Sequence, residues 1–175
     1  MSTDPNHSET STHRLGKGMT LVAWLLVLGL FTLFFSHWLD GQRNPNQEVT
    51  SQTLTNGVHE VVLRQNRYGH YVATGKIDGQ AVEFMVDTGA TAVSVPASLA
   101  QQLGLRRGAP LTTITAKGAI TTYATILNSV QLGDIVLRDI SASINPKSDE
   151  VLLGMSFLKQ LEFTQRGDTL TLRQY

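Results

Sequence analysis

The stretch AVEFMVDTG (residues 81–89) decides how the rest of this chain is interpreted. Its first six residues are mostly apolar and are typical of a β-strand that ends at Asp87. Thr88 and Gly89 follow, and Gly89 indicates a turn. Moving a charged carboxylate out of water is costly unless it is paired, hydrogen-bonded or protonated. A carboxylate at the end of an apolar strand therefore indicates a chemical role for Asp87.

One such role is the hydrolysis of a peptide bond by water. This reaction needs a base that activates the water and an acid that protonates the amide, and two carboxylates that share one proton can serve as both. The sequence contains DTG once, at residues 87–89, and so predicts that a second carboxylate comes from another copy of the chain. The alternative is that Asp87 and Thr88 only cap a turn, because Asp and Gly are common turn residues.

The composition narrows the classes of protein to which this chain can belong. The 175 residues carry a formal net charge of +0 and include no Cys. Balanced charge without a stripe of Lys and Arg argues against nucleic acid as a partner. The lack of Cys excludes disulfides and a Cys-based zinc site, and the His residues are scattered without the spacing of metal ligands. We therefore expect no metal and no cofactor.

The chain divides into segments of different composition. Residues 1–18 are polar and rich in Ser and Thr, which is typical of a disordered tail. Residues 19–39 form an uninterrupted apolar stretch that is long enough to cross a bilayer as a helix. Residues 40–56 are polar and show no convincing strand or helix, so we expect a flexible linker there. The folded domain is predicted at 57–175, where short alternating strands begin.

The apolar stretch 19–39 predicts a single-pass protein that contacts the lipid bilayer through these residues. A buried core helix and a cleaved signal peptide are the alternatives, but the stretch is long for a signal peptide and no cleavage site precedes Asp40. Arg14 and Lys17 precede the stretch and only Arg43 follows it closely, which favours a cytoplasmic N-terminus. In a bacterium this predicts an inner-membrane protein whose folded domain lies in the periplasm.

The folded domain is predicted to consist mainly of β-hairpins. Asp-Gly between two alternating apolar runs is the strongest short-range signal of a hairpin. The predicted hairpins have their turns at Asp78-Gly79, Gly133-Asp134 and 165–168. Short helices are expected at 96–104, which begins with Pro96, and at 156–160.

These elements contain a faint internal repeat. An apolar run closed by a glycine occurs at 84–89 and again at 151–154, and a short helical segment is predicted after each. Two related half-units suit a small closed β structure better than a solenoid, which needs three or more repeats. The fold class is therefore predicted as mainly β, a small closed β-barrel with one or two short helices, preceded by one transmembrane helix.

Several of these segments resemble the retropepsin-like aspartic proteases, and most closely their membrane-anchored bacterial members. A bare DTG is a weak signal, whereas DTG with its preceding strand and a later apolar-Gly segment in the right order is specific. The resemblance covers roughly residues 57–175 together with the anchor. It rests on DTGA (87–90) followed by the apolar Val93 and Val95, on VLLG (151–154) within VLLGMSFL (151–158), and on GDTL (167–170).

The resemblance implies an aspartic endopeptidase, a hydrolase of retropepsin-like fold that is active as a homodimer on peptide or protein substrates. Asp87 is then the catalytic residue, one from each protomer, and the two carboxyl groups hold one proton and activate a water molecule. The implied supporting residues are Thr88, Gly89 and Ala90 in the active-site loop, and Leu152, Leu153 and Gly154 in the second apolar-Gly segment beneath it.

A mobile flap is implied in TTITAKGAITTY (112–123), with a tip formed by Ala116, Lys117, Gly118 and Ala119. An ordinary Thr-rich hairpin is the alternative. One departure from the family is Ala90, which stands where many relatives carry a Ser that hydrogen-bonds the catalytic carboxylate. The alternative to an enzyme is a non-catalytic, membrane-tethered module of the same fold that binds peptides or drives assembly.

Overall fold

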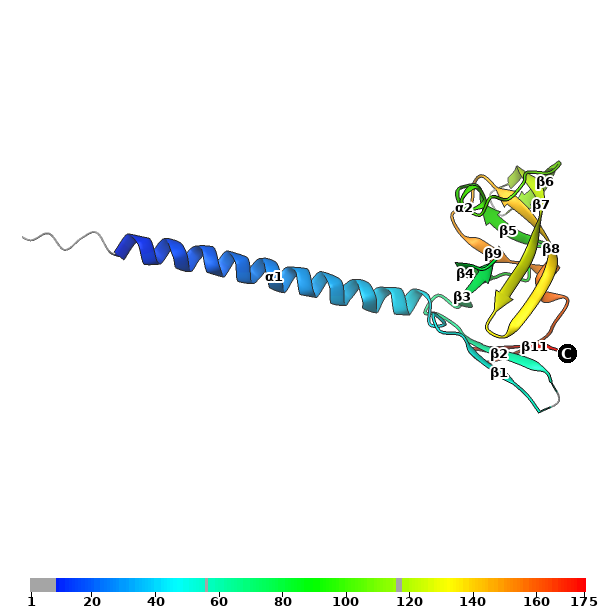
Figure 1. The fold of residues 1–175 in the computed structure, drawn as a ribbon, viewed down its shortest axis with the longest axis horizontal. Coiled ribbons are helices and arrows are strands. Elements are labelled where there is room, and N and C mark those ends of the chain that lie inside the picture. The colour runs from blue at the N-terminus through cyan, green and yellow to red at the C-terminus, as the bar shows by residue number, and fades with distance from the viewer. Residues whose placement is uncertain (1–8, 56, 116–117) are drawn as a thin grey trace, which may run out of the picture. The chain divides into compact units, whose positions relative to one another are not determined.

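The computed structural model describes residues 9–55, 57–115 and 118–175. The chain divides into two compact units, Met1–Gly41 and Gln42–Tyr175. Figure 1 shows the long helix α1 of the first unit and the strands of the second.

Helix α1 (Glu9–Arg43) accounts for the described part of the first unit. Its segment Gly18–Arg43 has a mean hydropathy of 2.2 over its most apolar window, none of which is buried. A helix this long and apolar can cross a membrane, and a signal sequence near an N-terminus has the same properties. The helix begins well before residue 19, inside the range predicted as a disordered tail, and residues 1–8 of that tail lie outside the described residues.

The second unit contains two β-sheets, which confirms the predicted class of mainly β with few short helices. The larger sheet has the strand order β3-β4-β9-β5-β8-β7-β6, and the smaller has the order β1-β2-β11-β10. β3 also pairs with β7, through Lys76 with Gln131 and Ile77 with Val130, so the pairing of the larger sheet returns to its first strand. The larger sheet consists of β3 (Val72–Ile77), β4 (Gln80–Val86), β5 (Val93–Pro96), β6 (Pro110–Thr115), β7 (Gly118–Leu132), β8 (Ile135–Asn145) and β9 (Val151–Leu153). The smaller sheet consists of β1 (Thr50–Thr53), β2 (His59–Arg64), β10 (Glu162–Arg166) and β11 (Thr169–Gln174).

The predicted hairpins are present. β3 and β4 are joined by Asp78 and Gly79, whose φ angles of 50° and 82° lie in the left-handed region that a two-residue type I′ turn requires. Asp78 is held in this conformation because its Oδ1 accepts a hydrogen bond from the N–H of Ser129 at 2.7 Å. β7 and β8, and β10 and β11, pair antiparallel around the other two predicted turns.

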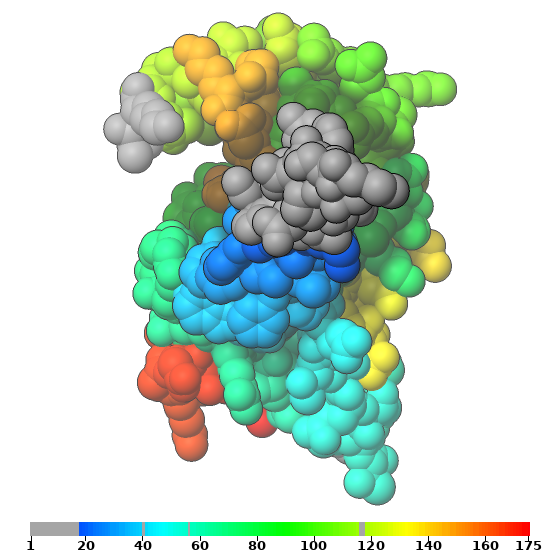
Figure 2. Space-filling model, turned by 90° about the vertical axis from the view of Figure 1, so that its left-hand side faces the viewer, coloured from blue at the N-terminus to red at the C-terminus, as the bar shows by residue number. Residues whose placement is uncertain are grey.

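The predicted short helices are present but shorter than expected. α2 (Ala97–Gln102) begins directly after Pro96, and α3 (Met155–Leu158) begins directly after Gly154. β6 and β7 form an antiparallel hairpin over the range in which a flap was implied. In Figures 1 and 2 this hairpin lies at the opposite end of the unit from the β1–β2 hairpin, which is cyan in Figure 2.

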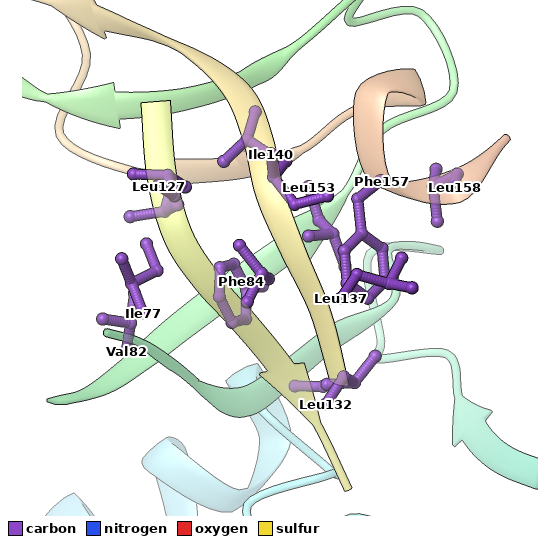
Figure 3. Packing of buried hydrophobic residues seen from close by; sticks show 14 of the residues in the cluster. Ile77, Val82, Phe84, Leu127, Leu132, Leu137, Ile140, Leu153, Phe157 and Leu158 are labelled. Atoms are coloured by element: carbon purple, nitrogen blue, oxygen red, sulfur yellow. The ribbon is translucent and has the colours of Figure 1, made fainter. Parts of the chain in front are cut away.

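Large apolar side chains from strands of the larger sheet and from α3 converge in the interior (Figure 3). Phe84 on β4, Leu153 on β9 and Phe157 on α3 are fully buried. The ring of Phe84 packs so closely on Gly75 that a Cβ at Gly75 would lie 2.8 Å from it. Because close-packed interiors resist displacement, β4 and β9 hold the residues that follow them in fixed places.

The range 40–56 differs from the predicted flexible linker. β1 pairs with β2 there, and Asn44 and Asn46 are almost fully buried. The side chain of Asn46 donates to the carbonyls of Arg64 (2.9 Å) and Val72 (2.7 Å), and its Oδ1 accepts from the N–H of Arg64 (2.8 Å). Asn46 is buried because its amide satisfies backbone groups of β2 and β3. The amide of Asn44 instead donates to the side chains of Thr74 and Glu83. We call residues 43–46, which connect α1 to this unit, the junction.

Candidate active site

Asp87 directly follows β4, and backbone contacts fix its loop. The N–H of Asp87 donates to the carbonyl of Leu153 (3.2 Å), which ties the loop to β9. The Oδ1 of Asp87 accepts a hydrogen bond from the N–H of Gly89 (2.8 Å). The N–H of Ala90 closes the turn on the carbonyl of Asp87 (3.2 Å). The carboxylate is therefore oriented by its own loop.

The loop is partly exposed in the single chain. Asp87 is half-buried, and Thr88 and Gly89 are exposed. Phe84 is fully buried, but burial decreases from Met85 onward as β4 leaves the core. An oriented carboxylate on an exposed loop is accessible to a substrate or to a second copy of the chain.

The second apolar-Gly segment lies beside the Asp87 loop. β9 pairs in parallel with β4, with Leu152 opposite Met85 and Leu153 opposite Val86. Leu153 is fully buried in the core, whereas Leu152 is half-buried. The structure thus brings together two segments that lie far apart in the sequence and that the sequence analysis grouped into one site.

Gly154 lies directly against the Asp87 loop. A Cβ at Gly154 would lie 2.6 Å from the carbonyl oxygen of Ala90 and still closer to that of Ala92. The next residue, Met155, donates its N–H to the same carbonyl of Ala90 at 2.8 Å. Only a residue without a side chain allows this approach of two backbones. Gly154 therefore supports the loop through its small size.

Ser156 is a supporting residue that the sequence analysis did not single out. It is buried, and its hydroxyl accepts a hydrogen bond from the N–H of Val93 at 3.0 Å. Val93 begins β5, so this contact holds the far end of the Asp87 loop. The available sequence signal was the position of Ser156 within VLLGMSFL, directly behind Gly154 and Met155.

A cavity of about 630 Å³ extends along β4. Glu83 and Met85 line it, and Met85 lies two residues before Asp87. Val151, at the start of β9, also lines it. The volume is within the range of ligand pockets in proteins, so the cavity is large enough for a side chain of a bound peptide.

The β6–β7 hairpin includes the residues 112–123 in which a flap is predicted. Gly118 has a φ angle of 106°, which only glycine adopts readily, and Ala119 is exposed. Ile114 on β6 is 87% exposed. Ala116 and Lys117, the other predicted tip residues, lie outside the described residues. The flap role of this hairpin stays a prediction.

Tyr71 contacts the strand that leads to the loop, because its backbone carbonyl accepts a hydrogen bond from the N–H of Val86 at 2.9 Å. Burial raises the pKa of the Tyr71 hydroxyl, so this side chain stays neutral at physiological pH. Among the described residues, no group of three or more His, Cys, Asp or Glu side chains is placed to hold a metal ion.

Comparison with known proteins places this geometry in context. Residues 73–160 match a family described as gag-polyprotein putative aspartyl protease. A Sinorhizobium protein, described as an uncharacterized protein in the cobV 5′ region, is 35% identical over 93% of this chain and 76% of its own length. An uncharacterized protein of Rickettsia prowazekii (strain Madrid E) is 26% identical over 90% of this chain and 69% of its own.

The fold is similar to a solved structure. The crystal structure of a retropepsin-like aspartic protease from Rickettsia conorii has 29% sequence identity and a TM-score of 0.59, and the match covers 73% of this chain and 96% of that one. The range 73–160 matched by the family includes both the Asp87 loop and Gly154. The two segments that form the candidate site therefore lie within the part of the chain that is similar to the family.

Proposed function

This chain belongs to the gag-polyprotein putative aspartyl protease family, whose fold is retropepsin-like, and from this membership we propose that it is an aspartic endopeptidase. The proposal adds three statements to the family. Asp87 is the catalytic residue, the active form is a homodimer, and α1 anchors the enzyme in a membrane. The reaction uses only carboxyl groups of the chain and water.

The observation that carries the proposal is the oriented and accessible carboxylate of Asp87. Its Oδ1 accepts the N–H of Gly89, and the neighbouring Thr88 is exposed in the single chain. Acid–base hydrolysis by carboxyl groups needs two of them, and one chain supplies one DTG loop. A two-fold dimer in which this loop meets its copy supplies the second carboxylate and covers Thr88, and two-fold symmetry is the commonest in homo-oligomers.

The pair of Asp87 side chains would act through one shared proton. Two carboxylates at close distance cannot both ionise, so one is protonated and one is charged. The charged group accepts a proton from water as the water oxygen adds to the peptide carbonyl carbon, and the protonated group donates its proton to the carbonyl oxygen. Protonation of the amide nitrogen then allows the C–N bond to break, which yields an acid and an amine.

The substrate is proposed to be an extended peptide segment of a protein. An extended peptide can hydrogen-bond to strands of the enzyme while its alternate side chains enter pockets. The cavity along β4 supports this proposal because it is large enough for such a side chain, and the β6–β7 hairpin spans the residues in which the flap is predicted. Closure of a flap over bound substrate excludes water other than the reacting molecule.

The membrane part of the proposal rests on α1. We propose that residues 19–39 remain in the mature protein as a single span, with residues 1–18 in the cytoplasm and the protease domain, predicted at 57–175, in the periplasm. The exposed apolar surface and length of α1 support this assignment, and a cleaved signal sequence is the alternative. A reporter fused to Tyr175 that is active only outside the cytoplasm tests the orientation. Activity of the reporter in the cytoplasm would reverse it.

Replacement of the catalytic carboxylate tests the enzymatic assignment. The full chain in detergent micelles is assayed against a library of quenched fluorescent peptides from mildly acidic to neutral pH. Asp87→Asn is expected to lower kcat/KM by about 10³-fold or more, because it removes the acid–base group. The matched control is Asp134→Asn in the exposed β7–β8 turn, which should cleave like the wild type. Cleavage by Asp87→Asn at the wild-type rate would refute the role of Asp87.

Mixing the two forms tests the shared dyad. If every dimer needs two Asp87 side chains, an equal mixture of wild-type and Asp87→Asn chains, paired at random, should retain about one quarter of the activity of an all-wild-type sample. Independent active sites would retain about one half. If neither form cleaves any peptide while both bind the same ones, the chain is a peptide-binding module of this fold and the proposal fails.

A further inference from the structure

We propose that the cavity along β4, which Met85 lines two residues before Asp87, selects a substrate side chain that ends in a positive charge, and that Arg43 of the junction occupies this place in the free enzyme. This inference rests on the proposed protease function and names its substrate class: peptides with a Lys or Arg close to the bond that is cut.

The cavity has an apolar floor and an acidic rim. Val72, Met85, Leu99 and Val151 supply apolar surface. Glu83, Asp149 and Glu150 supply three carboxylates. The lining also contains one Arg and one His, so with His neutral its formal charge is −2 (one positive and three negative side chains). A Lys or Arg side chain suits such a cavity, because its stem is apolar and its end is charged.

Arg43 already joins two of these carboxylates. Its Nε lies 3.5 Å from Glu83 Oε1, and its Nη2 lies 3.5 Å from Glu150 Oε1. Glu83 is on β4 and Glu150 directly precedes β9, so Arg43 bridges two elements that line the cavity. A guanidinium in this position shows that the two carboxylates can share one cation.

The junction holds Arg43 at the cavity through its backbone. The side chain of Asn66 donates to the carbonyl of Arg43 at 2.9 Å. The next residue, Asn44, is almost fully buried and donates to Glu83 Oε2 at 3.0 Å and to Thr74 Oγ1 at 3.1 Å. Because its backbone is fixed, Arg43 returns to the carboxylates whenever no other cation is bound.

The two ion pairs of Arg43 are weak enough to be replaced. The side chains of Arg43, Glu83 and Glu150 are 61%, 41% and 47% exposed, and both distances are long for a charged hydrogen bond. Exposed pairs of this kind contribute little free energy because water screens them. A basic side chain of a substrate, which enters the cavity with its stem on Met85 and Val151, can therefore displace Arg43.

Paired peptides test the selection. The full chain in detergent micelles is assayed with peptides that differ only in Lys or norleucine, placed in turn at each position near the cut bond. At one position the wild type should prefer Lys by about threefold or more in kcat/KM, in line with the small contribution of an exposed pair. Glu150→Gln should remove most of this preference by lowering kcat/KM more for the Lys peptide than for the norleucine peptide.

Variants of Arg43 test the competition. Arg43→Gln should raise kcat/KM for the Lys peptide about threefold through a lower KM, in line with the small contribution of an exposed pair, and should change kcat/KM for the norleucine peptide less. Arg43→Lys should behave like the wild type. Arg138→Gln, at an exposed arginine on β8, is the matched control.

The outcomes separate this inference from the proposed function. If peptides are cleaved in an Asp87-dependent manner but norleucine equals or exceeds Lys at every position, only the inference fails. It also fails if Arg43→Gln changes both peptides equally, since that result indicates a structural role. If no peptide is cleaved, or Asp87→Asn cleaves as well as the wild type, both proposals fail.

Discussion

The Asp87 loop and the junction are both fixed in place, but by different kinds of contact. Backbone meets backbone at the loop, where Gly154 lies against the carbonyls of residues 90 and 92. Side-chain amides meet backbone at the junction, where Asn46 satisfies groups of β2 and β3. The loop is exposed, whereas Asn44 and Asn46 are buried.

This difference determines which of the two regions can be predicted from the sequence. A close approach of two backbones requires glycine at a defined place, so the loop leaves a recognisable pattern of apolar residues closed by Gly. A buried asparagine that satisfies distant backbone groups looks like any polar residue of a linker. The loop was therefore predicted, and the junction was predicted as flexible chain.

The largest effect is expected from filling the space at Gly154. Gly154→Ala should lower the free energy of unfolding by about 3 kcal/mol, because the methyl group meets carbonyl oxygens that cannot move away. It should also lower kcat/KM by about 100-fold, since small displacements of catalytic groups are costly. Urea denaturation and peptide cleavage measure the two effects. Gly41→Ala, at a glycine with open space around it, is the control. A Gly154→Ala variant as stable as the wild type would show that the close backbone contact at Gly154 does not hold the Asp87 loop.

A smaller effect is expected at the junction. Asn46→Ala should lower the free energy of unfolding by about 2 kcal/mol, because it leaves buried backbone groups of Arg64 and Val72 without their partner. Cleavage measured well below the melting temperature should stay close to the wild type, in contrast to Gly154→Ala. Asn128→Ala, on the exposed surface of β7, is the matched control. Equal stability of the two variants would show that the junction is a flexible linker after all.

The smallest effect is expected from a polar cluster in the smaller sheet. This cluster is partly exposed, so its burial is between that of the Asp87 loop and that of the junction. Glu60 accepts hydrogen bonds from Arg173 Nε (2.7 Å) and Gln52 (2.8 Å). The contact with Arg173, followed by that with Gln52, lowers the pKa of Glu60 below its usual 4.5. A lowered pKa stabilises the fold above the unfolded pKa, and this stability is lost as pH falls through the folded pKa.

Glu60→Gln should therefore lower stability at neutral pH, and its difference from the wild type should vanish in acid, below the folded-state pKa of Glu60. Urea midpoints at both pH values measure this. Glu48→Gln, at an exposed glutamate, is the control and should show no such dependence. A difference that persists in acid would mean that Glu60 stabilises the sheet through its shape rather than its charge.

Parts of the fold were predictable because neighbouring residues encode them. Asp78-Gly79 adopts the left-handed conformations that its sequence favours, and the Gly-closed runs mark the ends of β4 and β9. The helix after Pro96 follows from proline geometry. The exposure of Asp87 could not be predicted, because burial depends on what the rest of the chain covers.

The sequence by itself determined the fold class and the hairpins, since turn chemistry and alternation act between adjacent residues. The place of the later apolar-Gly segment beneath the Asp87 loop was implied by the resemblance to the retropepsin-like family. Tertiary structure alone decided that Arg43, Glu83 and Glu150 meet at one cavity and that Asn46 is buried against β2 and β3. The physical reason is that these contacts join residues far apart in the chain. Their energies depend on a geometry that exists only after the two sheets have formed.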